Sequence, residues 1–406
     1  MERKKTPAAE QALTGTKAAC ALKKAVENLL SAPAYTNPAA AYTANEAALE
    51  VSEEMPVTDE QWEKLYEVVR NIRLLAPWNS LHESERVTLL LPGRDEPVYI
   101  VVMGSGGMTY GLAICPGYDS LDRLRRMEES HFIGNNLSIA FSQNCVNLYF
   151  GDREELESRD KAVIKKLGLK FRGSNEWPYF RSMKPGFMPW YINRDEAELT
   201  IDALQNFAMA YIAYQKKAFK VDFDKGETLL RFYDDEADIW YNTGMKMPPV
   251  PVIRPRLIID DDNLIAGLKN RKKTRKKIGF SINYLPAPFR KSEKERPKAL
   301  RAAVLTDMEN GKLINQASDI DDESNSFSEA IIDMFSGYII EHGRPISIAA
   351  NGDDRRYIAD FAEKLGIKLV EDERLAMIGS LMADIMEMIN SEQLSGLKDL
   401  LGDFPL

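Results

Sequence analysis

The sequence predicts an α/β protein of two mixed-sheet domains behind an N-terminal helical extension. Short apolar runs with strand-like spacing alternate with amphipathic segments of helical spacing, which is typical of βαβ units and partly parallel sheets. The proline-rich run 248–251 interrupts this alternation, and 406 residues provide enough chain for two cores. We therefore expect an extension over 1–55, an N-terminal domain over 56–247 and a C-terminal domain over 248–406.

The extension is rich in alanine and poor in aromatic residues. Fifteen of its first fifty residues are alanine, and Leu22, Val26 and Leu29 recur at helical spacing. This pattern predicts one loosely attached helix over residues 8–31, which Pro33 would end.

The N-terminal domain begins with a strong helix signal. Thr58 can cap a helix in which Trp62, Leu65 and Ile72 recur at helical spacing. The expected strands of this domain are 87–91, 98–103, 110–115, 137–141, 146–150, 169–171, 228–233 and 239–241. Its further expected helices are 119–127, 152–167 and 195–218. Glycine-rich segments, including 104–107, read as the turns between strands rather than as a phosphate cradle, because a strand and not a helix follows that glycine run.

The C-terminal domain continues the alternation of strands and helices. Its expected strands are 256–259, 278–285, 302–306, 312–316, 346–349 and 367–370, and its expected helices are 263–270, 326–342, 353–365 and 375–389. Asn310-Gly311 predicts a two-residue hairpin. Gly151-Asp152 and Gly352-Asp353 are each followed by an expected helix that ends at a glycine. Either a duplication of one ancestral domain or the sequence pattern common to all βαβ units would explain this similarity.

The expected hairpin, whose first strand ends at Thr306-Asp307, is followed by helix, strand, helix, strand and helix. This is the order of elements in ribonuclease H-like nucleases and integrases. Their chemistry requires several carboxylates around two metal ions. Asp307 stands where such folds place the first carboxylate, and Asp353 and Asp384 are weaker candidates. The second carboxylate is expected after strand 346–349, but Ala350 follows that strand. An unrelated α/β sheet is therefore the leading interpretation of this order. The ribonuclease H-like topology without nuclease activity is the second interpretation, and an active nuclease is the alternative function.

The sequence predicts no metal site and no cofactor. Its three cysteines are far apart, and none of the three histidines has a second histidine or cysteine at ligand spacing. Unpaired cysteines indicate a reducing compartment, so we expect a cytoplasmic protein. The sequence also lacks an apolar run of about 18 residues, so no membrane span is expected. Nothing in it indicates a small-molecule ligand.

The strongest departure from an ordinary composition is a basic segment over residues 269–301. Thirteen of its residues are basic and two are acidic, which gives +11 in a chain of net charge −9, so the other residues carry −20. Dense positive charge attracts phosphate groups through counterion release. The candidate binding residues are Arg271, Lys272, Lys273, Arg275, Lys276 and Lys277. A solvated surface, paired with the acidic loop 319–323, is the plainer interpretation, and Phe280 and Tyr284 offer base stacking nearby.

A run of short motifs between residues 165 and 204 resembles a bacterial family of unknown function. These motifs are Leu167-Gly168, Phe171-Arg172-Gly173, Trp177-Pro178, Pro185-Gly186, Pro189-Trp190 and Glu196-Ala197. Residues 343–372 resemble a second module of unknown function that often follows the first, and the two resemblances together cover about 58–406. The resemblance implies a bacterial cytoplasmic protein and supplies no activity. We expect a non-enzymatic interaction protein whose basic segment binds nucleic acid or an acidic protein.

Overall fold

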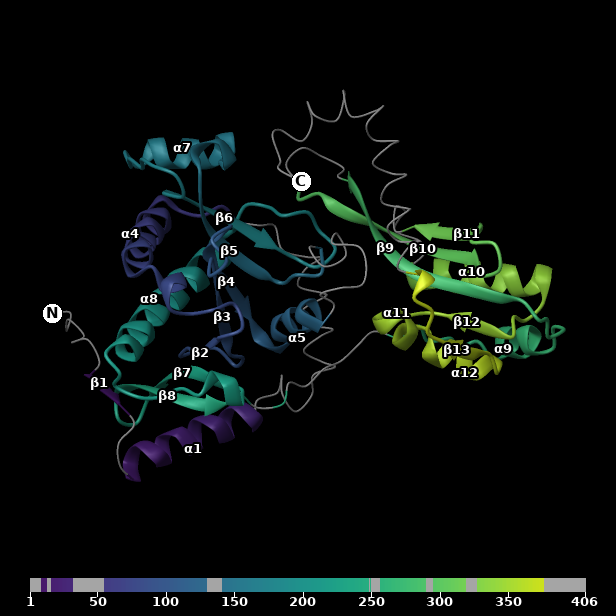
Figure 1. Ribbon diagram of the computed structural model, residues 1–406, viewed down its shortest axis with the longest axis horizontal. Coiled ribbons are helices and arrows are strands. Elements are labelled where there is room, and N and C mark those ends of the chain that lie inside the picture. The colour runs from purple at the N-terminus through teal and green to yellow at the C-terminus, as the bar shows by residue number, and fades with distance from the viewer. Residues whose placement is uncertain are drawn as a thin grey trace.

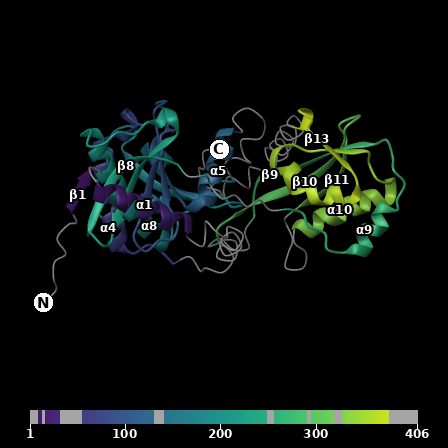
Figure 2. The same ribbon diagram turned by 90° about the horizontal axis from the view of Figure 1, so that it is seen from below.

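The computed structural model describes residues 9–12, 16–31, 55–129, 141–247, 249, 256–289, 295–318 and 327–375. Figures 1 and 2 show two bodies side by side along the long axis, each built around its own sheet. We call them the N-terminal unit and the C-terminal unit. The mixed α/β fold with two mixed sheets, predicted from the sequence, is confirmed.

The N-terminal unit contains an eight-stranded mixed sheet in the order β1-β8-β7-β2-β3-β4-β5-β6. β1 pairs with β8, and β2 with β7, in parallel, whereas the other neighbours are antiparallel. The strands are β1 (Ala9–Ala12), β2 (Val87–Leu90), β3 (Val98–Met103), β4 (Tyr110–Pro116), β5 (Cys145–Gly151), β6 (Trp177–Met183), β7 (Glu227–Asp234) and β8 (Ile239–Lys246).

Helices cover both faces of this sheet. The α-helices are α1 (Thr16–Ser31), α4 (Asp59–Leu75), α5 (Gly117–Glu129), α7 (Ser158–Lys166) and α8 (Arg194–Gln215), with short 3-10 helices at Pro77–Asn79, Arg153–Glu155 and Phe223–Lys225. α4 and α8 pack together on one face and form the main core with β2 to β5. α5 and α1 contribute to smaller apolar clusters built on the alternate strand residues, which face the opposite way. The predicted cap of α4 is present, because Thr58 and Gln61 form a reciprocal capping box.

The single helix predicted for residues 8–31 is wrong at its start. Residues Ala9–Ala12 form β1, which adds a parallel strand to the edge of β8, and the helix begins at Thr16. Alanine favours helix locally, but backbone pairing with an open sheet edge overrides that preference. The side chains of Ala21, Leu22 and Ala25 pack on β7 and β8, so this helix is attached through an apolar contact.

One strand prediction in the N-terminal unit is also wrong. Residues 169–171 are not a strand, and the strand lies instead at Trp177–Met183. The sequence did not predict this strand because it contains Pro178, and proline usually argues against a strand. β6 is the last strand of the sheet and pairs with β5, and proline is tolerated in such an edge strand. Of the expected strand over 137–141, residues 137–140 lie outside the described residues.

The C-terminal unit contains a five-stranded sheet in the order β11-β10-β9-β12-β13. β10 is antiparallel to β9 and β11, and β12 is parallel to β9 and β13. These strands are β9 (Lys277–Phe289), β10 (Lys298–Asp307), β11 (Leu313–Ser318), β12 (Ser347–Ala349) and β13 (Lys368–Val370). The sheet therefore combines an antiparallel three-stranded meander, β9 to β11, with two parallel strands, β12 and β13. The two sheets differ in strand order, which argues against duplication.

The C-terminal unit departs from prediction in one helix, one strand and one hairpin. Its helices are α9 (Asp262–Lys269), α10 (Phe327–His342), α11 (Gly352–Tyr357) and α12 (Ala359–Leu365). The helix expected over 353–365 breaks at Ile358, and residues 256–259 form no strand. The expected two-residue hairpin is a longer loop, because the Asp307 N–H donates to the Lys312 carbonyl and encloses four residues. Residues 319–326 and 376–389 lie outside the described residues.

The boundary at residues 248–251 remains a prediction, and limited proteolysis tests it. We expect a nonspecific protease to cut there, or within residues 1–55, before it cuts within residues 60–240. α8 should resist because ten of its residues are buried, so cleavage requires the surrounding core to open. Mass spectrometry of the first fragments identifies the cut. Early cleavage inside Arg194–Gln215 would contradict the proposed division.

Candidate nucleic-acid interface

The predicted basic residues occupy the loop between α9 and β9, which we call the basic loop (residues 269–277). Figure 1 places α9 at the end of the C-terminal unit that is remote from the N-terminal unit. Backbone hydrogen bonds fix the loop: the Arg344 N–H donates to Lys272, the Thr274 N–H donates to Arg344, and the Ile346 N–H donates to Lys276, at 2.8–2.9 Å. The basic loop is therefore an ordered extension of the β9–β12 ladder.

The six candidate side chains are exposed, but their charges are not equally available. Lys276 lies 3.2 Å from Glu309 and 3.6 Å from Asp307, and these carboxylates raise the pKa of its ammonium group. The positive charge of Lys277 contributes to lowering the pKa of the Asp372 carboxyl. Among the described residues no ion pair is made by the other four, which are Arg271, Lys272, Lys273 and Arg275. These four carry the uncompensated charge of the basic loop.

The acidic loop that the sequence pairs with this charge, residues 319–323, lies outside the described residues. The two described residues that flank it are Ser318, which pairs with Ala302, and Phe327, whose ring lies 4.7 Å from the Arg301 guanidinium carbon. α10 then runs 16 residues, or roughly 24 Å, from Phe327 to the end of the unit that holds the basic loop. Both anchors are therefore distant from the basic residues.

The aromatic residues near the basic loop are not free to stack on bases. Phe280 is fully buried and packs against Phe335, with ring centroids 5.2 Å apart. The Tyr284 ring packs in a tilted arrangement against Phe141 of the N-terminal unit, with ring centroids 5.6 Å apart. The side chains at the basic loop can therefore contact phosphates, and the stacking suggested by the sequence is not supported.

The carboxylates proposed for a nuclease site are not brought together. Asp307 ends β10 rather than the first strand of the sheet; it accepts the Glu309 N–H at 2.8 Å and lies beside the basic loop. The Glu309 N–H and the nearby Lys276 outweigh desolvation and lower the pKa of Asp307. Asp353 begins α11 at the end of the unit that faces the N-terminal unit, where it pairs with Arg126. Asp384 lies outside the described residues.

No metal centre forms in the part of the chain that the structure describes. It contains no group of three histidine, cysteine, aspartate or glutamate residues that could hold a metal ion. The first strand of the sheet, β9, contains no carboxylate, and Ala350 follows β12. The geometry required for two-metal hydrolysis is therefore not present among these residues.

The glycine-rich segment 104–107 is a hairpin turn, as predicted, and its polar groups are already used. The Glu83 carboxylate accepts the N–H groups of Gly104 and Ser105 at 3.1 and 3.2 Å, and it also accepts the Ser105 hydroxyl. Desolvation alone would raise the pKa of Glu83, but these hydrogen bonds lower it. The turn thus binds a carboxylate of its own chain.

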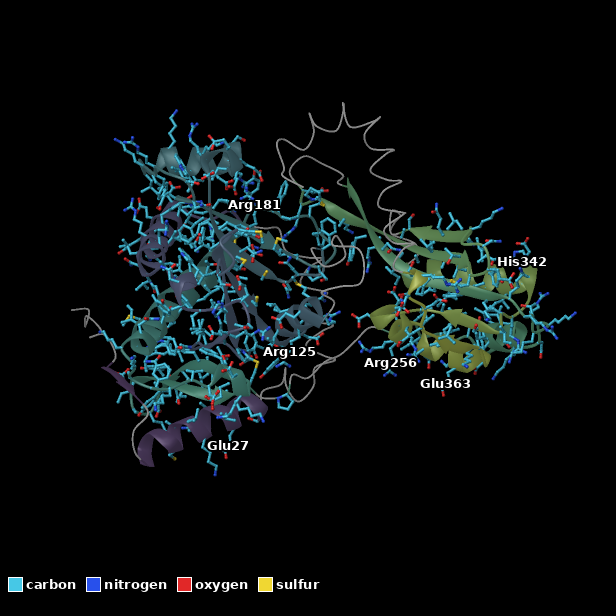
Figure 3. The ribbon with its side chains drawn as sticks, in the orientation of Figure 1. Glu27, Arg125, Arg181, Arg256, His342 and Glu363 are labelled. Atoms are coloured by element: carbon cyan, nitrogen blue, oxygen red, sulfur yellow. The ribbon has the colours of Figure 1, made fainter. Side chains whose placement is uncertain are left out.

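A buried ion network that no sequence pattern indicated surrounds Arg181 on β6, which is labelled in Figure 3. The Arg181 side chain is 7% exposed and donates to both oxygens of Asp160 at 3.1 and 2.8 Å. It also donates to Glu157 at 2.9 Å and to the Phe180 carbonyl at 2.7 Å. Desolvation opposes its charge, but the Asp160 carboxylate raises the pKa of Arg181. This network fixes α7 on the sheet.

Two family models match the chain. The domain of unknown function DUF7309 matches residues 62–231, and the domain of unknown function DUF6930 matches residues 264–386. The chain contains both domains in this order. The predicted resemblance to a two-module family of unknown function is thereby confirmed. DUF7309 falls within the N-terminal unit, and DUF6930 contains all five strands of the C-terminal unit.

The other comparisons add no named relative. No curated protein and no solved structure matches the chain. No helix among the described residues is long and apolar enough to cross a membrane.

Proposed function

We propose that the protein binds nucleic acid through the basic loop and contacts phosphates without reading bases. The observation that carries this proposal is the set of four exposed cations on a loop held by backbone hydrogen bonds, with no ion pairs to described residues. An ordered basic surface loses less entropy on binding than a flexible one. Contacts from arginine and lysine to phosphate oxygens position a protein on nucleic acid but carry no sequence information.

Duplex nucleic acid is the form that this loop fits best. Without an exposed aromatic side chain, the basic loop lacks the stacking platforms typical of single-strand binding. A duplex compensates with a higher density of phosphate charge, about one charge per 1.7 Å of helix axis. A divergent nuclease is not favoured, because the described carboxylates do not converge.

Replacing Arg271, Lys272, Lys273, Arg275, Lys276 and Lys277 with glutamine should abolish most of this binding. If four phosphates are neutralised, the logarithm of affinity should fall with the logarithm of salt concentration with a slope of about −3.6, a loss of roughly 150-fold between 50 and 200 mM salt. The six-residue variant should flatten that slope equally for all sequences. Fluorescence anisotropy with labelled duplex and single-stranded oligonucleotides measures both quantities.

A matched variant distinguishes the loss of the basic loop from the loss of total positive charge. Replacing the six exposed lysines Lys165, Lys166, Lys170, Lys216, Lys220 and Lys246 with glutamine removes the same charge from the N-terminal unit. That variant should retain the wild-type slope. The proposal fails if the wild-type protein shows no salt-sensitive binding to either oligonucleotide at micromolar concentration, and an acidic protein then becomes the expected partner of the basic loop.

A further inference from the structure

The hairpin of β9 and β10 extends from the C-terminal unit as an arm that reaches the N-terminal unit (Figures 1 and 2). Near its far end, the Met188 N–H donates to the Pro297 carbonyl, and the Ala299 N–H donates to the Gly186 carbonyl, both at 2.9 Å. Phe187 and Lys298 form an antiparallel bridge between these two bonds. The arm therefore adds a short strand-like ladder to a loop of the other unit.

That loop, residues 184–190, is itself held against the edge of β6. Ser182 and Trp190 exchange two backbone hydrogen bonds of 2.8 and 3.0 Å, and the Gly186 N–H donates to the Phe141 carbonyl at 2.9 Å. Gly186 has a φ of +78°, in the left-handed region that favours glycine. A hydrogen-bonded path thus runs from the first sheet through this loop to the second sheet.

Arg296 anchors the contact. Its Nε donates to the Met188 carbonyl at 3.2 Å, its Nη1 donates to the Ser182 hydroxyl at 3.0 Å, and its Nη2 donates to the Ser182 carbonyl. The guanidinium carbon lies 5.8 Å from the centre of the Phe187 ring. The planar guanidinium group of arginine can donate to three acceptors while it faces an aromatic ring. The single ammonium group of lysine cannot reproduce this set of contacts.

Ser182 links Arg296 by hydrogen bonds to a carboxylate of the N-terminal unit. The fully buried Ser182 hydroxyl donates to Glu196 at 2.6 Å while it accepts from Arg296. Glu196 also accepts the Asn193 N–H at 3.0 Å in the capping box of α8. Arg296 is thereby linked to the start of α8, the longest of the described helices in the N-terminal unit.

A second contact between the units is more exposed. Arg126 on α5 pairs with Asp353 on α11 at 2.8 Å, and their side chains are 28% and 44% exposed. Ion pairs with such exposure contribute at most about 1 kcal/mol. The arm combines backbone pairing with a partly buried, charge-assisted cluster, so it should dominate the association of the two units.

We propose that loop 184–190 is the docking site of the N-terminal unit for the arm of the C-terminal unit, with Arg296 as its specificity-determining residue. This assigns a role to motifs that the nucleic-acid proposal leaves unexplained. Pro185-Gly186 and Pro189-Trp190 shape the loop, and Glu196 accepts the Ser182 hydroxyl that itself accepts from Arg296. The docking site holds the two units as one body in the full-length chain.

Replacing Arg296 with alanine in the full-length protein tests this proposal. Hydrogen exchange at the Met188 and Ala299 amides, whose acceptors lie on the opposite unit, should accelerate by about 10–100-fold, because charge-assisted hydrogen bonds are lost. Small-angle scattering should show a larger radius of gyration. Arg296→Lys should retain charge but recover less than half of the lost protection.

Two controls make the result specific. Arg159→Ala removes an exposed arginine that lies 4.4 Å from the Tyr191 ring, outside the arm, and should leave both amides unchanged. The Leu112 and Ile114 amides in the core strand β4 should keep their protection in Arg296→Ala. Unchanged exchange at Met188 and Ala299 in Arg296→Ala overturns the proposal. Equal acceleration at β4 also overturns it, because global unfolding would then explain the change.

Discussion

Arg181→Met should lower the free energy of unfolding of the N-terminal unit by about 3–5 kcal/mol, the usual cost of leaving a buried charge without its partner. The variant removes the cation between Asp160 and Glu157 while keeping an apolar stem of similar length. Asp160, whose side chain is 9% exposed, would then hold a carboxylate in a poorly solvated place. Urea unfolding followed by tryptophan fluorescence measures the change.

A double variant shows that the unpaired charge is the cause. Arg181→Met combined with Asp160→Asn removes both charges of the closest pair and should recover more than half of the lost stability. Lys166→Met is the matched control, because its ion pair with Asp59 is more than 60% exposed on both sides and should contribute less than about 1 kcal/mol. A loss below about 1 kcal/mol in Arg181→Met would show that the network is dispensable.

Asp354→Asn should stabilise the C-terminal unit at alkaline pH. The Asp354 carboxyl accepts the Ile282 N–H at 3.1 Å, on the edge of β9 beyond the last β12 pairing at Gly279. It therefore supplies an acceptor where the neighbouring strand has ended. Burial, reinforced by the adjacent Asp353 and opposed by this hydrogen bond, raises the pKa of Asp354 to about 7.

The direction of the pH effect follows from this raised pKa. The unfolded chain ionises Asp354 near its ordinary pKa of 3.8, whereas the folded chain keeps the proton until about pH 7. The contribution of Asp354 to stability therefore declines as pH rises from about 4 to 7 and is constant above that range. The full shift corresponds to about 4 kcal/mol, and partial solvent access reduces the expected effect to about 2–4 kcal/mol.

Unfolding curves between pH 4 and pH 8 test this expectation. The asparagine oxygen can still accept the Ile282 N–H but does not titrate, so the stability gap between Asp354→Asn and wild type should be small at pH 4 and reach about 2–4 kcal/mol at pH 8. Asp353→Asn is the control, since its carboxyl is 44% exposed and paired with Arg126. A gap that does not grow with pH would show that Asp354 ionises normally in the folded protein.

Local patterns predicted the elements whose causes are local. The capping box at Thr58, the helical spacing through Ile72 and the strand at Val98–Met103 were all read from neighbouring residues. The exposure of the basic loop was also readable, because consecutive lysines and arginines seldom enter a core. The position of the loop at one end of the second sheet was not readable, since it depends on pairing with residues about seventy positions away.

Errors arose where an edge or a distant contact decided the outcome. Ala9–Ala12 reads as helix by propensity but pairs with β8, and Pro178 disguised an edge strand. No local pattern could show which of Asp353 and Asp354 accepts a backbone N–H and which pairs with an arginine. Only the packing of α11 against β9 directs one carboxyl to a backbone N–H and leaves the other for Arg126.

The sequence by itself determined the α/β class, the two-module organisation and the basic loop, because spacing, composition and charge are properties of neighbouring residues. Tertiary structure decided how those residues are used. Arg296 and Lys273 belong to the same basic segment, yet one is held by three acceptors of the N-terminal unit and the other is exposed. The reason is physical: a cation's role depends on the acceptors and the solvent that surround it, and folding brings those acceptors from more than one hundred residues away.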